Sequence, residues 1–122
     1  MKNILIIDDG ERIAELISFY FLPAGIQSVF KTNVADAQAY LMKNNVHFII
    51  LETGLPGMTV FSREVSEMWK IPFIIVSVNR ERDDILNGFT LGADDYITKP
   101  FDDNELIHRV ANVLKRRGVT QS

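Results

Sequence analysis

Short runs of apolar residues recur along the chain at nearly regular intervals, and each has the length of a β-strand. They read NILII at 3–7, IQSVF at 26–30, HFIIL at 47–51, FIIV at 73–76 and DYI at 95–97. Three of these runs are continuous rather than alternating, which is typical of strands that helices cover on both faces. The pattern predicts five mostly buried strands.

The segments between these runs have the period of amphipathic helices. The apolar positions expected to face the core are, segment by segment, Ile13, Leu16, Ile17 and Tyr20; Val34, Ala37 and Leu41; Phe61, Val65, Met68 and Trp69; Ile85, Leu86 and Phe89; and Leu106, Val110, Val113 and Leu114. Asn33 is expected to cap the second helix, and Asp102 with Glu105 forms a capping box for the last. The fourth stripe is the weakest, so we expect that helix to be the least firmly packed.

Strands that alternate with helices predict a fold class. Right-handed crossovers between successive strands produce a parallel sheet, so the pattern indicates a doubly wound α/β domain. A chain of 122 residues suits one such domain with one core.

Composition narrows the class of protein further. The net charge of −3 gives no bulk attraction to nucleic acid, so we do not expect this domain to bind DNA by itself. Without cysteine, the chain has no disulfides, thiolate metal sites or cysteine nucleophiles. No apolar run approaches the roughly 20 residues that cross a bilayer, and the start of the chain turns acidic before a signal-like core develops. We therefore expect a cytoplasmic protein.

Polar residues follow the predicted strands at the points where they end. Asp8 and Asp9 follow the first strand, Glu52 the third and Ser77 the fourth, and the fifth is followed by Lys99. In an open parallel sheet the chemistry lies outside the carboxyl ends of the strands, so these side chains are expected to converge. Each alone has an ordinary structural explanation, as a helix cap, a loop residue or a solvated charge.

The charges in this group indicate what it could bind. Three clustered carboxylates repel one another unless a cation intervenes, and Lys99 or a divalent metal such as Mg²⁺ can supply it. A hydroxyl and a lysine on the far side would suit an oxyanion such as a phosphoryl group.

Four parts of the sequence form one set in order and spacing: IDD at 7–9, LPGM at 55–58, Ser77 and LGADDYITKPF at 91–101. With them the chain resembles the receiver domain of bacterial two-component response regulators, and is most similar to receivers that precede winged-helix DNA-binding domains. The resemblance implies a flavodoxin-like (βα)5 domain at residues 1–117 with strand order 2-1-3-4-5, followed by a linker or tail at 118–122. It also implies a signalling module rather than an enzyme, and a cis bond between Lys99 and Pro100.

The resemblance assigns a role to each polar residue. The implied Mg²⁺ ligands are Asp8, Asp9, the residue at position 52 and the main-chain carbonyl of Gly54. Ser77 and Lys99 would contact the phosphoryl oxygens, and Ser77 and Tyr96 would act as the conformational switch.

Position 52, where the family has its phosphoacceptor aspartate, is a glutamate here. The extra methylene moves the carboxylate about 1.5 Å toward Lys99 and misplaces it as a nucleophile. Val78 and Gly10 also depart from the family pattern, which has a small residue and commonly an acid at these positions. We therefore expect an atypical receiver without ordinary aspartyl phosphorylation and with weak or absent Mg²⁺ binding. Two alternatives stay open: Glu52 imitates a phosphorylated aspartate, or it only abolishes phosphorylation.

The family also implies a homodimer through the fourth helix, the fifth strand and the fifth helix. The matching residues on that face are Asn87, Asp94, Asp95, Glu105 and Arg109. Lys115, Arg116 and Arg117 at the end of the last helix are expected to compensate the helix dipole rather than to bind nucleic acid.

Three functions are compatible with these features. The first is the regulatory receiver of a transcription factor, with a partner or C-terminal DNA-binding domain. The second is a stand-alone protein-interaction domain with no DNA-binding output. The third, a flavin carrier on the same fold, is disfavoured because the two carboxylates of DDGERI at 8–13 would repel a flavin phosphate.

Overall fold

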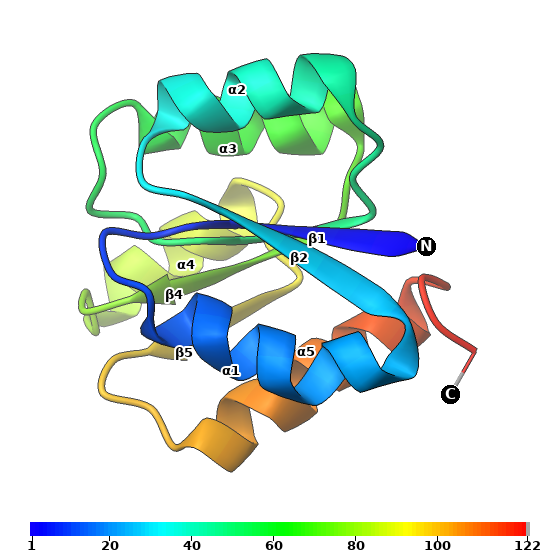
Figure 1. Cartoon of the computed structure of the whole chain (residues 1–122). Coiled ribbons are helices and arrows are strands. Elements are labelled where there is room, and N and C mark those ends of the chain that lie inside the picture. Colours follow the sequence, from blue (N-terminus) through cyan, green and yellow to red (C-terminus); the bar gives the residue numbers. More distant parts are fainter. Residues whose placement is uncertain (122) are drawn as a thin grey trace.

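The computed structural model describes residues 1–121 and has a five-stranded parallel sheet at its centre, with helices on both faces (Figure 1). The strands are β1 (Lys2–Ile7), β2 (Ile26–Lys31), β3 (Phe48–Leu51), β4 (Phe73–Ser77) and β5 (Asp95–Thr98). Their order is β2-β1-β3-β4-β5, and every neighbouring pair is parallel. The predicted doubly wound, flavodoxin-like fold is confirmed.

The helices form one layer on each face of the sheet. They are α1 (Arg12–Phe21), α2 (Val34–Lys43), α3 (Met58–Glu64), α4 (Arg82–Thr90) and α5 (Asp103–Arg116). Figure 1 shows α1 and α5 on one side of the sheet and α2 and α3 on the other. Alternate residues of the strands pack into two cores on opposite faces of the sheet. Ile4 and Ile6 face α1 and α5, while Leu5 and Ile7 face α2 and α3. Burial on both faces explains why the strands are continuous apolar runs.

The third helical segment departs from the sequence prediction. After α3 the chain widens into a π-helical turn, η2 (Val65–Trp69), and Lys70 then adopts a left-handed conformation with φ of 54°. Phe61 and Val65 are buried as predicted, but Met68 is 69% exposed, so its placement in the core was wrong. A π turn has more residues per turn than an α-helix, which rotates the residues at its end out of the expected stripe.

The predicted caps of the second and last helices are present. The side chain of Asn33 accepts a hydrogen bond from the Asp36 amide, and that of Asp102 accepts from the amides of Asn104 and Glu105. Among the described residues the Glu105 side chain does not accept from the Asp102 amide, so only the Asp102 half of the predicted capping box is formed. As expected, α4 is loosely packed, because Gly88 is its only fully buried residue. Leu86 and Phe89, which were expected to face the core, are exposed, so that part of the prediction was wrong. Both caps fix where a helix leaves the sheet edge that carries the polar residues.

The end of the described chain folds back against α5. The amides of Val119 and Thr120 both donate to the carbonyl of Leu114, and Val119 packs against the core. The division at residue 117 stays a prediction, and Ser122 lies outside the described residues. No helix within residues 1–121 has the length and apolar character needed to span a membrane.

Candidate functional site

Three acids meet at the carboxyl ends of β1 and β3. Asp8 and Asp9 follow β1 directly, and Glu52 follows β3, the neighbouring strand. One carboxylate oxygen from each residue lies within 4.8 Å of one oxygen of each of the others. Asp8 and Glu52 are buried while Asp9 is exposed, so the cluster is open to solvent on the Asp9 side. The sequence prediction that these acids converge is correct.

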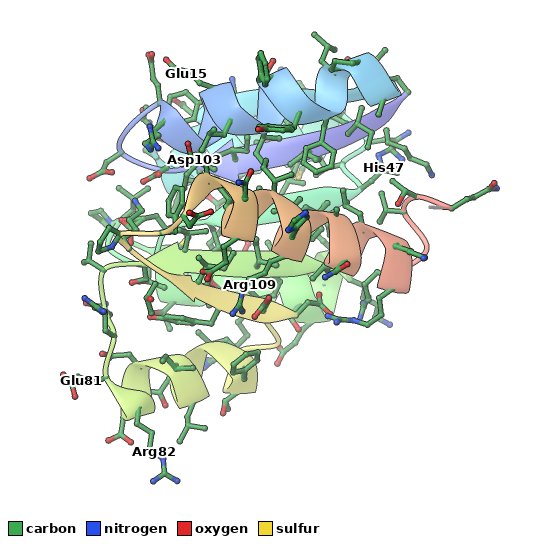
Figure 2. All side chains as sticks on the ribbon, turned by 90° about the horizontal axis from the view of Figure 1, so that it is seen from below. Glu15, His47, Glu81, Arg82, Asp103 and Arg109 are labelled. Atoms are coloured by element: carbon green, nitrogen blue, oxygen red, sulfur yellow. The ribbon has the colours of Figure 1, made fainter. Side chains whose placement is uncertain are left out.

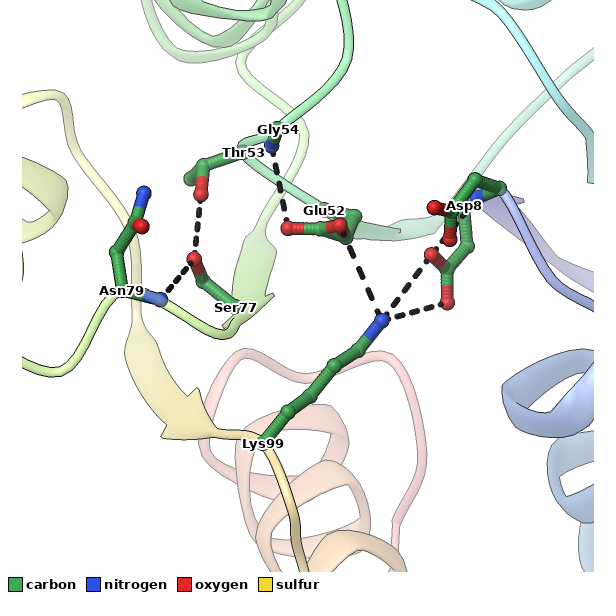
Figure 3. Close-up of polar contacts among 8 residues, drawn as sticks. Asp8, Glu52, Thr53, Gly54, Ser77, Asn79 and Lys99 are labelled. Atoms are coloured by element: carbon green, nitrogen blue, oxygen red, sulfur yellow. Dashed lines mark hydrogen bonds and ion pairs between the residues drawn. The ribbon is translucent and has the colours of Figure 1, made fainter.

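Lys99 reaches into the acid cluster from the end of β5 (Figure 3). Its Nζ lies 3.2 Å from both carboxylate oxygens of Asp8 and 3.9 Å from Oε2 of Glu52. Burial raises the pKa of the Asp8 carboxyl above its ordinary value, and the positive charge of Lys99 opposes that rise. Lys99 therefore provides an internal counter-ion, more closely to Asp8 than to Glu52. The peptide bond that follows, Lys99-Pro100, is cis as expected.

The loop after β3 orients the Glu52 carboxylate. Oε1 accepts a hydrogen bond of 3.1 Å from the amide of Gly54, and Oε2 points toward Lys99 (Figure 3). The longer acid thus approaches the lysine as predicted, but at ion-pair distance rather than in a short hydrogen bond. Gly54 thus contacts Glu52 through its main-chain amide, whereas the family resemblance implied a role for its carbonyl.

Ser77 lies at the end of β4 and makes its contacts with Thr53 and Asn79. Its side chain has no exposed surface. Its Oγ lies 2.6 Å from Oγ1 of Thr53 and accepts a 3.0 Å hydrogen bond from the amide of Asn79. Its carbonyl accepts from the amide of Lys99 at 2.7 Å. Ser77 is therefore linked to Lys99 through the main chain and to the residue after Glu52 through its hydroxyl.

Tyr96 points into the domain. Its ring is 7% exposed, and its hydroxyl donates a 2.7 Å hydrogen bond to the carbonyl of Asn79. Among the residues beside the ring are Gly88 of α4 and Ile75 of β4. Tyr96 is therefore held at both ends, by the loop after β4 and by α4.

The predicted dimer face carries ion pairs within the chain. Arg109 of α5 donates to both carboxylate oxygens of Asp95 at 2.9 and 3.1 Å, and its Nε lies 4.0 Å from a carboxylate oxygen of Glu105. Arg117 pairs with the Asp94 side chain at 3.2 Å. Figure 2 shows Arg109 on α5 beside the sheet, with α4 at the margin of the domain.

Next to these ion pairs lie the terminal cations of α5 and an exposed part of α4. Arg116 donates to the carbonyl of Asp94, so two of the three terminal cations contact the turn before β5 instead of serving the helix dipole alone. Asn87 is exposed on α4, as are Leu86 at 48% and Phe89 at 45%. Leu86 and Phe89 thus form an exposed apolar strip on α4, next to Asn87.

Chemically, the site offers hard oxygen ligands to a cation and a lysine to an anion. Carboxylates are the ligands that Mg²⁺ prefers, so the donor set fits the metal, but the ammonium of Lys99 already neutralises part of the negative charge of the acids.

The sequence prediction missed Thr53, Asn79 and Gly88. The only available signal was a hydroxyl directly after the acid at position 52.

Several known proteins are similar to this chain in sequence and in fold. Residues 4–111 match the profile of the response regulator receiver domain. The phosphate regulon transcriptional regulatory protein PhoB of Pseudomonas aeruginosa is 36% identical over 124 aligned positions, which cover 96% of this chain and 53% of PhoB. The sensory transduction protein RegX3 of Mycobacterium tuberculosis is 32% identical over 120 positions, which cover 97% of this chain and 53% of RegX3.

The chain thus spans about half the length of these relatives. A crystal structure of a two-component response regulator from Clostridium difficile has the same fold. It superimposes with a TM-score of 0.84 at 24% identity, over 96% of this chain and 98% of that one.

Proposed function

Because the chain belongs to the response regulator receiver family, and is therefore a signalling module and not an enzyme, we propose that it regulates a DNA-binding output without ordinary aspartyl phosphorylation. The names of PhoB and RegX3 describe transcriptional regulation and sensory transduction, and both proteins are about twice as long as this chain. Their lengths support an output domain or partner acting together with this receiver.

One observation carries the proposal: the acid after β3 is Glu52, and both of its oxygens are engaged. Oε1 is bound by the Gly54 amide, and Oε2 faces Lys99. An aspartate in this place would end about 1.5 Å closer to its own backbone. Nucleophilic attack depends steeply on placement, so the longer and anchored carboxylate is a poor phosphoryl acceptor.

The proposal is tested by intact-mass spectrometry after incubation with acetyl phosphate and Mg²⁺. We expect the protein mass to stay unchanged. A double variant, Glu52→Asp with Val78→Ala, serves as the matched control, because it restores the shorter acid and the small residue that the family has after Ser77. It is expected to gain one phosphoryl group. A phosphoryl adduct on the natural protein would contradict the proposal.

The proposal includes weak Mg²⁺ binding. Asp8, Asp9, Glu52 and the main-chain carbonyl of Gly54 would hold the ion, which when bound neutralises the clustered acids. Lys99 already supplies positive charge within 3.2 Å of Asp8, so the metal has to compete with it.

We further propose that two copies associate through α4, β5 and α5. Asn87, Asp94, Asp95, Glu105 and Arg109 line that face, and the exposed Leu86 and Phe89 lie on the same helix as Asn87. The apolar strip supports association because its burial is favourable, whereas the ion pairs already formed within the chain add little.

A further inference from the structure

A row of hydrogen bonds runs from the end of β3 to the loop after β4, beside the acid cluster rather than through it. It begins at Thr53, the residue after Glu52, whose Oγ1 lies 2.6 Å from Oγ of Ser77 (Figure 3). Ser77 in turn accepts from the amide of Asn79 at 3.0 Å. The carbonyl of Asn79 then accepts from the hydroxyl of Tyr96 at 2.7 Å. Thr53 and Tyr96 are thus connected through three successive hydrogen bonds.

The hydroxyl of Ser77 is fully buried, so it depends on these partners. A hydroxyl has one proton to donate and two lone pairs to accept with, and a buried one without partners is costly. One lone pair takes the Asn79 amide, and the contact with Thr53 provides the remaining partner. Glu52 forms no hydrogen bond with Ser77 among the described residues. Thr53 therefore fixes the Ser77 side chain, and Ser77 fixes the start of the loop that carries Asn79.

The space that Tyr96 occupies depends on Gly88. A Cβ added to Gly88 would lie 2.7 Å from Cδ2 of Tyr96 and 3.0 Å from Cδ1 of Ile75. Because Gly88 has no side chain, the ring of Tyr96 can lie inward against α4. This observation is independent of the hydrogen bonds, and it shows that the inward ring is matched by α4 as well as by the loop.

We propose that Thr53 is a positioning residue that holds Tyr96 inward, through Ser77 and Asn79. The Thr53 hydroxyl supplies a fixed, uncharged partner for Ser77 and so sets the loop after β4 and the face formed by α4 and β5. This assignment rests on the proposed function, because it identifies which contact sets the state of that face in a receiver that takes no phosphoryl group.

The test uses the full chain with 3-fluorotyrosine incorporated, followed by fluorine NMR. The protein has three tyrosines, and the Tyr96→Phe variant assigns the Tyr96 signal. Thr53→Val keeps the shape of the side chain but removes the hydroxyl. Losing one hydrogen bond of ordinary strength should change the ratio of inward to outward Tyr96 by about fivefold. The Tyr96 signal is expected to move toward its solvent-exposed position in this variant, while those of Tyr20 and Tyr40 stay in place.

Three further variants complete the experiment. Thr53→Ser keeps the hydroxyl and should retain the natural Tyr96 signal. Gly88→Ala should displace Tyr96 by direct contact and so marks the position of the outward signal. Ser77→Ala removes the contact with Thr53 together with the acceptor of the Asn79 amide, and it replaces Thr53→Val if that variant does not fold. An unmoved Tyr96 signal in the folded variant that lacks the contact would overturn the proposal.

The measurement needs neither a phosphodonor nor Mg²⁺, so it is separable from the proposed function. A phosphoryl adduct on the natural protein would contradict the absence of phosphorylation. It would leave the effect of Thr53 on Tyr96 as measured.

Discussion

Lys99 is the residue that most determines what the acid cluster can bind. Its ammonium lies 3.2 Å from both oxygens of Asp8 and 3.9 Å from Glu52, so two buried carboxylates share one internal cation. A divalent ion entering the same cluster is repelled by that ammonium. If the cluster holds Mg²⁺ as proposed, we expect its affinity to depend on Lys99, a residue that is not one of its ligands.

Replacing Lys99 with methionine should strengthen Mg²⁺ binding by about tenfold, because a cation–cation repulsion at partly buried sites is worth at least that factor. Amide shifts of Asp8 and Asp9 during a Mg²⁺ titration measure the affinity. Lys70, exposed after η2, gives the control variant Lys70→Met, for which no change is expected. Equal affinity in the natural protein and Lys99→Met would show that Lys99 does not oppose the ion.

The sequence was sufficient to predict which charged residues meet at the site, but not which of them pair. Asp8, Asp9, Glu52 and Lys99 could be predicted to meet because parallel strands end at one edge. That Lys99 lies closer to Asp8 than to Glu52 depends on differences below 1 Å, which side-chain torsions set and spacing does not encode. The Thr53 contact was missed for the same reason.

At the scale of elements, β1 and the start of β3 are joined by a histidine. Nδ1 of His47 accepts a 3.1 Å hydrogen bond from the amide of Asn3, and the His47 amide donates to the Asn3 carbonyl at 2.9 Å. Burial lowers the pKa of His47 from its ordinary 6.5, and the positive charges of Lys2 and the chain amino terminus lower it further. The junction thus favours the neutral imidazole.

This junction should weaken in mild acid. The unfolded chain takes up the proton first as the pH falls below about 6.5, so the stability from neutral His47 is present above that pH and is lost as the pH falls through the folded pKa. Between about pH 7.5 and pH 5.5, urea unfolding should show a larger loss of unfolding free energy in the natural protein than in His47→Gln. His108→Gln, altered at an exposed position on α5, is the control. Parallel curves for the natural protein and His47→Gln would contradict the prediction.

The strands were predictable from sequence because burial on both faces leaves a continuous apolar run, as in Phe48–Leu51. The helix stripes were predictable only in part. Met68 was placed wrongly because η2 widens the turn, and no residue in VSEMW indicates that change. Tyr20 was also placed wrongly, since it is 45% exposed although α1 is regular. The weak stripe of α4 correctly indicated a loosely packed helix, but the inward placement of Leu86 and Phe89 was wrong, because both lie exposed on it.

At the scale of the whole molecule, association through α4, β5 and α5 should depend on the apolar strip of α4. Phe89→Ser should weaken self-association by about tenfold, because burying a large side chain contributes roughly 1.5–3 kcal/mol and Phe89 is only partly available. Sedimentation velocity over a concentration series measures the change. Phe19→Ser is the matched control, since Phe19 is 74% exposed on α1, away from this face.

The same assay separates the two roles of Glu52. If its carboxylate imitates a phosphorylated aspartate, Glu52→Gln weakens association, whereas an unchanged association constant indicates that Glu52 only abolishes phosphorylation. An unaltered constant in Phe89→Ser would instead place the interface elsewhere on the molecule.

Both ends of the described chain emerge on the side of the sheet where β1 begins, whereas the acids and Lys99 lie where the strands finish (Figure 1). An affinity tag or surface anchor fused at either end would therefore leave the acidic edge facing solution. Immobilised protein should give the same ion and phosphodonor responses as free protein, which makes sensor-chip assays of this receiver practicable.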